Sequence, residues 1–365
     1  MRDDLTDLLS KLVEIDSVNP ALVEGGAGEE RIADFIAGWA REAGLEAELV
    51  GERPSAIVRA RGSGGGRTLL LCGHIDTVNV EGMRDPHVAR VEGDRLYGRG
   101  AYDMKSGVAS ALIACREAAK LGLAGDVVVA AVADEEHASL GVQAALRHVS
   151  ADAAIVTEPT ELEIAIAHKG FIWAEIELTG RAAHGSRPHL GVDAIVKAGP
   201  VLTALGELDR SLGGREHPLL GRGSVHASVI SGGVEMSSYP AECVIGIERR
   251  TLPGETAADV EAELEALLER CRAADPELVV EKRMGLVREP FEVDPDAEIV
   301  KALGDREPVG VSYWADSAFI SAAGIPTVLY GASGEGAHAQ VEWVSLDATE
   351  TVARTLVEVA RAICA

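Results

Sequence analysis

Positive charge is scarce in this sequence of 365 residues, which has 34 Lys and Arg against 59 Asp and Glu and a formal net charge of −25. Binding to nucleic acid or to an anionic membrane surface depends on basic side chains that neutralise phosphate. We therefore expect neither nucleic acid nor membrane among the partners. Long apolar runs are also missing. The longest spans residues 127–133, whereas a membrane-spanning helix needs about 20 residues.

Cysteine is another residue that the sequence uses little, with five scattered copies and no CxxC pair. An odd number without paired spacing predicts free thiols in a reducing compartment rather than a disulfide framework. The first residues, MRDDLTDLLSKL, are acidic and amphipathic and lack the apolar stretch of a secretory signal. From these observations we expect a cytoplasmic protein.

Apolar residues make up 47% of the chain, which is enough for a substantial core, and the length suggests two domains. Four continuously apolar runs are typical of strands buried on both faces; they span 68–72, 127–133, 153–157 and 326–330. Helical periodicity lies between them, over 108–121 and 140–148. Strands that alternate with helices predict an α/β domain with a mostly parallel sheet.

The stretch from 170 to 283 has a different pattern. Residues 171–179 and 241–248 partly alternate between apolar and polar, and long helical patterns follow these strands, over 192–208 and 257–273. Such runs predict a small antiparallel sheet with helices on one face. We therefore expect an α+β domain of residues 170–283, inserted into a larger domain of residues 1–169 and 284–365.

Histidine and acidic residues follow each of the four buried strands. In an open α/β sheet, ligands bind at the carboxyl ends of the strands. A further aspartate follows a glycine-rich turn, YGRGAYD, and precedes a helical pattern. The side chains expected at this edge are His74, Asp76, Asp103, Glu135, Glu136, Glu158 and His338.

This combination of histidines and carboxylates predicts a metal site. Any one of the acids could be an ordinary surface residue, but clustered carboxylates without a cation repel one another. The ligand types suit zinc, with manganese or cobalt as substitutes. So many carboxylates favour two metals over one, because a carboxylate can bridge two ions that share a water.

Two further roles follow from the order of the residues. Asp76 lies two residues after His74, a spacing that suits a hydrogen-bond acceptor fixing the imidazole tautomer. Glu135 and Glu136 are adjacent, so one can bind metal while the other accepts a proton from the attacking water. The sequence pattern alone does not order these two glutamates.

Several strings resemble the zinc aminoacylase/carboxypeptidase family, which includes acetylornithine deacetylase, succinyl-diaminopimelate desuccinylase, aminoacylase and glutamate carboxypeptidase. They are GHIDTV (73–78), YGRGAYDMKSGVA (97–109), DEE (134–136), TEPT (157–160), AAHGSRPHLGVDAI (182–195), ERRTLPGE (248–255) and GEGAHA (334–339). Their order and spacing match the family from residue 73 to residue 344. The chain is on this basis identified as similar to that family.

The resemblance implies two Zn²⁺ ions per subunit. One would be held by His74, Asp103 and Glu158, and the other by Asp103, Glu136 and His338, with Asp103 bridging. It implies Glu135 as the general base and Asp76 as the partner of a metal ligand. It also implies a cis peptide bond between Asp103 and Met104.

The resemblance also assigns roles to the inserted domain. That domain would form the interface of a homodimer, and His184 would reach the active site of the other subunit to stabilise an oxyanion. Arg250 aligns with an arginine that grips a substrate carboxylate, for which a guanidinium is suited. The chain departs from the family's pattern at Ser237, where many members carry Asn.

The family's chemistry is hydrolysis of an amide that links an acyl or aminoacyl group to an amino acid. We therefore expect a deacylase that acts on an N-acyl amino acid or a similar small amide. A dipeptidase or glutamate-type carboxypeptidase is the alternative enzyme, and a catalytically silent binding dimer is the alternative outside catalysis. The intact base and ligand set argue against the silent dimer, because a silent member has no need of them.

Overall fold

The computed structural model describes residues 1–365 and divides into two compact units. The first comprises residues 1–166, 293–309 and 315–365, and the second comprises residues 167–292 and 310–314. The second unit therefore interrupts the first along the chain, and segments beyond 170–283 pack with it. None of the helices has the length and apolar character that a membrane span requires.

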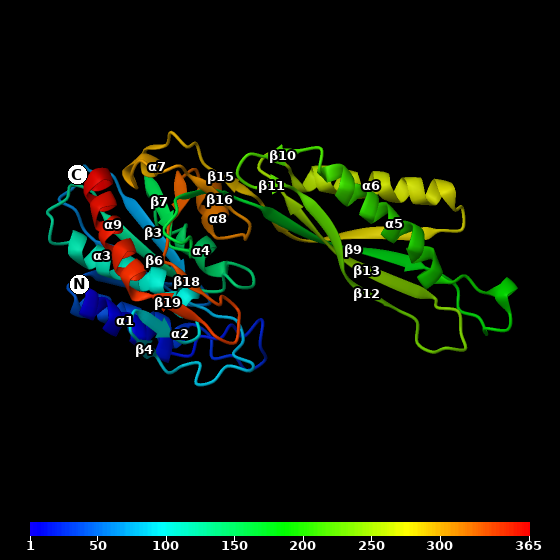
Figure 1. Cartoon of the computed structure of the whole chain (residues 1–365), viewed down its shortest axis with the longest axis horizontal. Coiled ribbons are helices and arrows are strands. Elements are labelled where there is room, and N and C mark those ends of the chain that lie inside the picture. Colours follow the sequence, from blue (N-terminus) through cyan, green and yellow to red (C-terminus); the bar gives the residue numbers. More distant parts are fainter. The chain divides into compact units, whose positions relative to one another are not determined.

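The first unit is built on a sheet with the strand order β1-β2-β6-β3-β7-β17-β8, of which Figure 1 labels β3, β6 and β7. The four runs that the sequence predicts as buried strands lie side by side in its centre and pair in parallel, which confirms the mostly parallel sheet. Strands β1, β2 and β8 add antiparallel pairs towards the edges. The bounds are β1 Glu46–Val50, β2 Ser55–Ala60, β3 Leu69–His74, β6 Val127–Val132, β7 Ala153–Val156, β8 Ala165–His168 and β17 Thr327–Leu329.

Helices cover this sheet. The long helices α3 and α9 pack against each other and against β3, and α1 packs on both of them (Figure 1). Helix α1 buries the apolar stripe of its leucines, as an amphipathic helix at a surface must. The bounds are α1 Arg2–Glu14, α2 Glu30–Glu42, α3 Ser106–Ala118, α4 Leu140–Ala145, α7 Glu298–Ala302, α8 Ser317–Ala322 and α9 Leu346–Cys364.

A small antiparallel sheet in the same unit has the order β18-β19-β5-β4. It joins two distant parts of the chain, because β19 near residue 343 pairs with β5 near residue 97. The bounds of its four short strands are β4 Arg90–Glu92, β5 Arg95–Tyr97, β18 Gly334–Glu335 and β19 Trp343–Ser345. No sequence pattern predicts this sheet. It positions His338, which lies between β18 and β19, and the loop of Asp103, which follows β5.

The second unit is a four-stranded antiparallel sheet, β12-β13-β9-β14, with helices α5 and α6. Alternate residues of β9 and β13 are buried, and their apolar side chains form one core with those of the two helices. This confirms the predicted α+β architecture. The bounds are β9 Gly170–Thr179, β12 Ser224–Gly232, β13 Glu242–Thr251, β14 Val279–Arg288, α5 Ala194–Leu212 and α6 Ala257–Ala274. The remaining short strands are β10 Glu216–His217, β11 Gly221–Arg222, β15 Phe291–Glu292 and β16 Val309–Val311.

Helix ends in the second unit are capped by side chains that the sequence supplies. Asp193 accepts a hydrogen bond from the amide of Val196 at the start of α5. Thr256 and Asp259 form a reciprocal capping box at the start of α6. Such caps satisfy amide groups that have no partner within the helix, and each contributes about 0.5–2 kcal/mol to stability.

Candidate metal centre

The strand ends of the first unit deliver the predicted side chains to one place. His74 is the last residue of β3, and Glu158 follows the end of β7 by two residues. Glu135 and Glu136 follow β6, and His338 lies in the loop between β18 and β19. All of these residues belong to the first unit, and the edge they occupy is the carboxyl end of the parallel strands.

Two groups of three residues lie close enough to hold a metal ion each. In the first, ligand atoms of His74, Asp103 and Glu158 lie within 4.8 Å of one another. In the second, the same holds for Asp103, Glu136 and His338. Asp103 belongs to both groups, and it offers a different oxygen to each.

The contacts of Asp103 show this shared position directly. Its Oδ1 lies 3.1 Å from Nε2 of His74, and its Oδ2 lies 3.2 Å from Nε2 of His338. The same nitrogen of His338 lies 3.2 Å from Glu136 Oε2. Asp103 sits in an irregular turn, Ala101–Lys105, and the peptide bond that follows it is cis, as the family resemblance predicts.

The electrostatics of the centre reflect an excess of buried acid. Burial raises the pKa of Glu135 well above its ordinary range and raises the pKa of Glu158 to about 8. Hydrogen bonds with Asp103 and Glu136 raise the pKa of His338 to about 10. Burial opposes ionisation of Asp103, but hydrogen bonds from the two histidines hold its pKa below the ordinary value. Without a cation, Glu135, Glu158 and His338 therefore hold protons more tightly than usual. A bound cation would relieve the repulsion between the carboxylates.

The donor set fits a pair of divalent ions. Each group offers one imidazole nitrogen and oxygens from two carboxylates, a combination that suits zinc and related divalent metals. Open coordination positions remain in such a set, which is a feature of catalytic rather than structural zinc sites. The arrangement can therefore bind two ions and leave room for water and a substrate carbonyl.

Asp76 contacts the imidazole of His74 through its backbone carbonyl and its carboxylate. Nδ1 of His74 lies 3.0 Å from the backbone carbonyl of Asp76 and 3.6 Å from its carboxylate. Either contact directs Nε2 of the imidazole towards Asp103. The Asp76 carboxylate itself accepts hydrogen bonds from the amides of Glu135 and Glu136, at 3.1 and 3.2 Å. Asp76 thus orients the segment that carries the proposed base.

A buried polar network continues behind Asp76. Asn19 donates to Asp76 at 2.8 Å and to Asp134 at 3.1 Å, and Arg53 forms ion pairs with both Asp134 and Glu29. Asp134 immediately precedes the proposed base and has a positive φ of 68°. No sequence pattern predicts this network. Asp134 could have been suspected from its place at a strand end, whereas Asn19 and Arg53 have no signal of that kind.

The remaining two predicted site residues belong to the second unit. His184 is exposed, and its Nδ1 hydrogen-bonds with Ser186 of the same loop at 2.8 Å. Arg250 lies on β13, where it donates to Glu248 at 2.7 Å and stacks over the ring of Phe171. The neighbouring Arg249 is buried and paired with Glu255 and Glu263, so it serves the core of that unit.

Comparison with known proteins gives one family. Residues 70–362 match peptidase family M20/M25/M40. Acetylornithine deacetylase from Proteus mirabilis is 30% identical, in an alignment that covers 93% of this chain and 92% of that protein. Acetylornithine deacetylase from Photorhabdus laumondii is 28% identical, with the same coverage of both chains.

Solved structures share the fold. Aminopeptidase PepT from Bacillus cereus superposes with a TM-score of 0.81 at 17% identity, covering 100% of this chain and 99% of that one. The YXEP protein of Bacillus subtilis, described as a dinuclear metal binding peptidase, gives a TM-score of 0.78 at 16% identity and covers 100% and 98%. At these identities the likeness shows the architecture of the chain.

Proposed function

The chain belongs to peptidase family M20/M25/M40, and from that premise we propose that it hydrolyses the amide bond of an N-acyl amino acid at a dinuclear zinc centre. Membership of this family makes the chain a metal-dependent hydrolase. The acetylornithine deacetylases that align over nearly its whole length support a deacylase. The single observation that carries the proposal is Asp103, with one carboxylate oxygen beside each of two ligand groups.

In this proposal, His74, Asp103 and Glu158 hold one Zn²⁺ and Asp103, Glu136 and His338 hold the other, with Co²⁺ or Mn²⁺ as substitutes. When bound, the ions supply Lewis acidity to the substrate carbonyl and lower the pKa of water. Asp76 fixes the orientation of His74 and of the backbone at 135–136. The ligand set needs all three carboxylates ionised, which is the state that a bound cation favours.

Glu135 is the general base of the proposed reaction. Its carboxylate accepts a proton from the attacking water and passes that proton to the nitrogen of the leaving amine. Burial raises the pKa of Glu135 well above its ordinary range, which makes its carboxylate a stronger base than an exposed glutamate. Glu136, its neighbour, contacts His338 and takes the role of ligand.

Two residues of the second unit complete the proposed site. His184 donates a hydrogen bond to the oxyanion that forms at the substrate carbonyl. Arg250 pairs with the carboxylate of the amino-acid part of the substrate, for which a guanidinium offers two parallel donors. The Arg250 side chain donates to Glu248 of the same strand and lies over the ring of Phe171.

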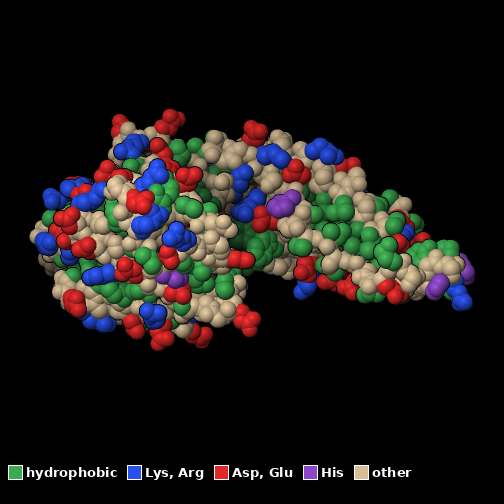
Figure 2. All heavy atoms as spheres, turned by 60° about the horizontal axis from the view of Figure 1, so that its bottom comes forward, with side chains coloured by type: hydrophobic (Ala, Val, Ile, Leu, Met, Phe, Trp, Pro, Cys, Tyr) green, Lys and Arg blue, Asp and Glu red, His purple; other side chains and the backbone are tan.

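We further propose that the protein is a homodimer through its second unit, and that His184 acts at the centre of the partner subunit. Strand β12 is an edge strand, with one neighbour in the sheet and mostly exposed residues. Apolar side chains are exposed on it and on the loop that follows: Val229, Ile230, Val234 and Met236. Figure 2 shows hydrophobic side chains at the surface of the molecule. Exposed edges and apolar side chains of this kind favour association.

All five cysteines are buried free thiols, which supports a cytoplasmic location.

A substrate panel tests the proposed function. Zinc-loaded protein is assayed with N-acetyl, N-succinyl and N-formyl amino acids and with dipeptides of the same amino acids, and Glu135→Gln protein is the matched control. We expect hydrolysis of N-acyl amino acids that exceeds hydrolysis of the dipeptides and disappears in the control. Preference for dipeptides would select the alternative enzyme, and no turnover of either class would leave only the silent dimer.

A further inference from the structure

The carboxylate of Glu342, near the metal centre, accepts four hydrogen bonds. Its Oε1 accepts hydrogen bonds from the amides of Tyr102 and Asp103, at 2.9 and 3.0 Å. Its Oε2 accepts from the amide of Gly100 at 3.0 Å and from Arg99 at 2.7 Å. A carboxylate has about four lone-pair directions, and this one, which is 1% exposed, gives all of them to one loop.

Three amides of that loop, those of Gly100, Tyr102 and Asp103, pair with Glu342 rather than with backbone carbonyls. Gly100 has a positive φ of 78°, and Asp103 has φ −111° and ψ 95°, so the chain around them makes no regular helix or strand. Buried backbone N–H groups need partners, and an unpaired one costs roughly 1–3 kcal/mol. Glu342 supplies those partners, and one of the amides belongs to Asp103 itself.

Arg99 connects this carboxylate to two other parts of the centre. It is 3% exposed and donates to the carbonyls of Asn79 and Ala339, each at 3.0 Å, as well as to Glu342. Asn79 lies shortly after His74, and Ala339 directly follows His338. One arginine–glutamate pair therefore ties together the three segments that carry His74, Asp103 and His338.

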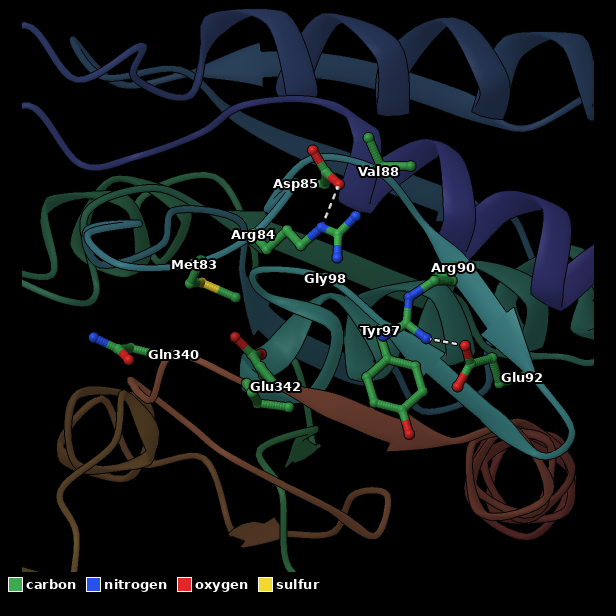
Figure 3. A pocket seen from close by; sticks show the side chains of 11 residues that line it. Met83, Arg84, Asp85, Val88, Arg90, Glu92, Tyr97, Gly98, Gln340 and Glu342 are labelled. Carbon is green, nitrogen blue, oxygen red and sulfur yellow. Dashed lines mark ion pairs between the residues drawn. The ribbon is translucent and has the colours of Figure 1, made fainter.

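A pocket of about 550 Å³ lies beside Glu342 (Figure 3). Its wall includes Gly98, Gln340 and Glu342. The charged side chains of the opposite wall pair among themselves, Arg84 with Asp85 and Arg90 with Glu92. Glu342 takes no part in these ion pairs, and its hydrogen bonds all go to Arg99 and the Asp103 loop. Its role therefore concerns the metal centre rather than the pocket.

We propose that Glu342, held by Arg99, is a positioning residue that orients Asp103 between the two ligand groups and so allows a second metal ion to bind beside the first. The inference rests on the proposed function, in which Asp103 is the ligand shared by both ions. Without the carboxylate of Glu342, the loop can rotate Asp103 towards one group and away from the other. The first ion then keeps its ligands and the second loses one.

Metal binding by Glu342→Gln protein tests this proposal. Glutamine keeps the size of the side chain but replaces one acceptor oxygen with an NH₂ group. That group is a donor and would face the N–H donors of the Asp103 loop. The metal content of the purified full-length proteins is measured by elemental analysis, and Co²⁺ is titrated into chelator-treated samples. Outer partners of metal ligands typically contribute about 10–100-fold to metal affinity. We expect the Kd of the second Co²⁺ to rise by that factor while the first changes little.

A matched control separates this effect from a general loss of stability. Asp126 is a carboxylate, less buried than Glu342, that also accepts from a backbone amide and from arginine, namely from Gly62, Arg59 and Arg61. It directly precedes β6, at the sheet edge opposite to the metal centre. Asp126→Asn should keep both Co²⁺ affinities. A loss of the second ion in this control as well would contradict the inference.

A second variant covers the case in which Glu342→Gln does not fold. Arg99→Lys keeps the positive charge beside Glu342 but cannot reach Asn79 and Ala339 with the same planar fork. It should raise the Kd of the second Co²⁺ above that of the unaltered protein, by less than the roughly 10–100-fold expected for Glu342→Gln, and leave the first Kd little changed. Unchanged binding of both ions in the folded variants, Arg99→Lys alone included, would overturn the role of Glu342. Binding of fewer than two ions by the unaltered protein would overturn the proposed dinuclear centre, and this inference with it.

Discussion

In the first unit, six of the seven candidate site residues are buried or half-buried and only His338 is exposed, whereas in the second unit His184 is exposed and Arg250 is half-buried. Glu158 is 6% exposed and Asp76 is fully buried. The loop of Asp103 donates four hydrogen bonds to Glu342, three from backbone amides and one from the side chain of Arg99. His184, by contrast, is exposed and hydrogen-bonds within its own loop.

The difference shows how work is divided along the chain. Charged groups that must sit within a few ångströms of one another need a preorganised, hydrogen-bonded surrounding, because their repulsion would otherwise move them apart. Groups that meet a substrate or a partner subunit must remain accessible, and loops on a rigid scaffold provide such groups. We therefore assign the metal chemistry to the first unit and the contacts with substrate and partner to the second.

The largest effect is expected from the proposed base of the first unit. Glu135→Gln should lower kcat by about 10²–10⁴-fold and leave the metal content nearly normal, because Glu135 belongs to neither ligand group. Glu136→Gln is the matched neighbour and should lower the occupancy of one metal. Turnover and elemental analysis of both proteins decide the point. Metal loss in Glu135→Gln with full metal in Glu136→Gln would exchange the two roles.

The next largest effect is expected on the free energy of unfolding, which should fall more when a buried ion pair is removed than when an exposed one is. Arg53→Met leaves the buried carboxylates of Glu29 and Asp134 without their cation, which typically costs about 3–5 kcal/mol. Arg2→Met removes the more exposed ion pairs with Asp94 and Asp347, and pairs of that kind are worth about 0–1 kcal/mol. Urea unfolding, followed by circular dichroism, measures both. Equal shifts of the two midpoints would contradict the importance of the buried network.

The exposed histidine of the second unit should matter for rate and little for stability. His184→Ala should lower kcat by about 10²–10³-fold, as loss of an oxyanion donor does, with an unchanged melting temperature. If His184 acts in the partner subunit, a mixture with Glu135→Gln protein should regain up to half of the activity per heterodimer. The heterodimer then has one site with both residues intact.

Exchange of subunits is verified separately with two different affinity tags. Heterodimers that form and yet remain as inactive as the two single mutants would show that His184 serves its own subunit or has no part in catalysis. Such a result would remove the proposed link between the second unit and the partner's centre. It would leave the metal centre of the first unit untouched.

The sequence predicted the central architecture because buried parallel strands have a simple signature. The runs 68–72, 127–133, 153–157 and 326–330 became β3, β6, β7 and β17, and a strand buried on both faces is continuously apolar. Strands such as β12 and β14 escaped prediction because they are largely exposed and carry mixed residues. The short strands β5 and β19 escaped because their pairing joins residues far apart in the chain.

The candidate site shows the same division. Metal-ligating residue types at strand ends can be read from a sequence, and the structure places His74, Asp103, Glu136, Glu158 and His338 in two adjoining groups. Residues that support them carry no such mark. Glu342 and Arg99 act on backbone amides and carbonyls, and the geometry of an irregular loop is not encoded in a local pattern. Arg53 and Asn19 likewise depend on tertiary contacts with Asp134.

The central claim, that Asp103 is shared by two metal ions, is tested most directly by anomalous diffraction from crystals of the zinc-loaded protein. Data collected on both sides of the zinc absorption edge locate each ion without assumptions about the ligands. We predict two peaks about 3.5–4 Å apart, one beside His74 and Glu158 and one beside Glu136 and His338, with Asp103 between them. A single peak in metal-replete crystals, with the carboxylate of Asp103 turned away from one ligand group, would contradict it.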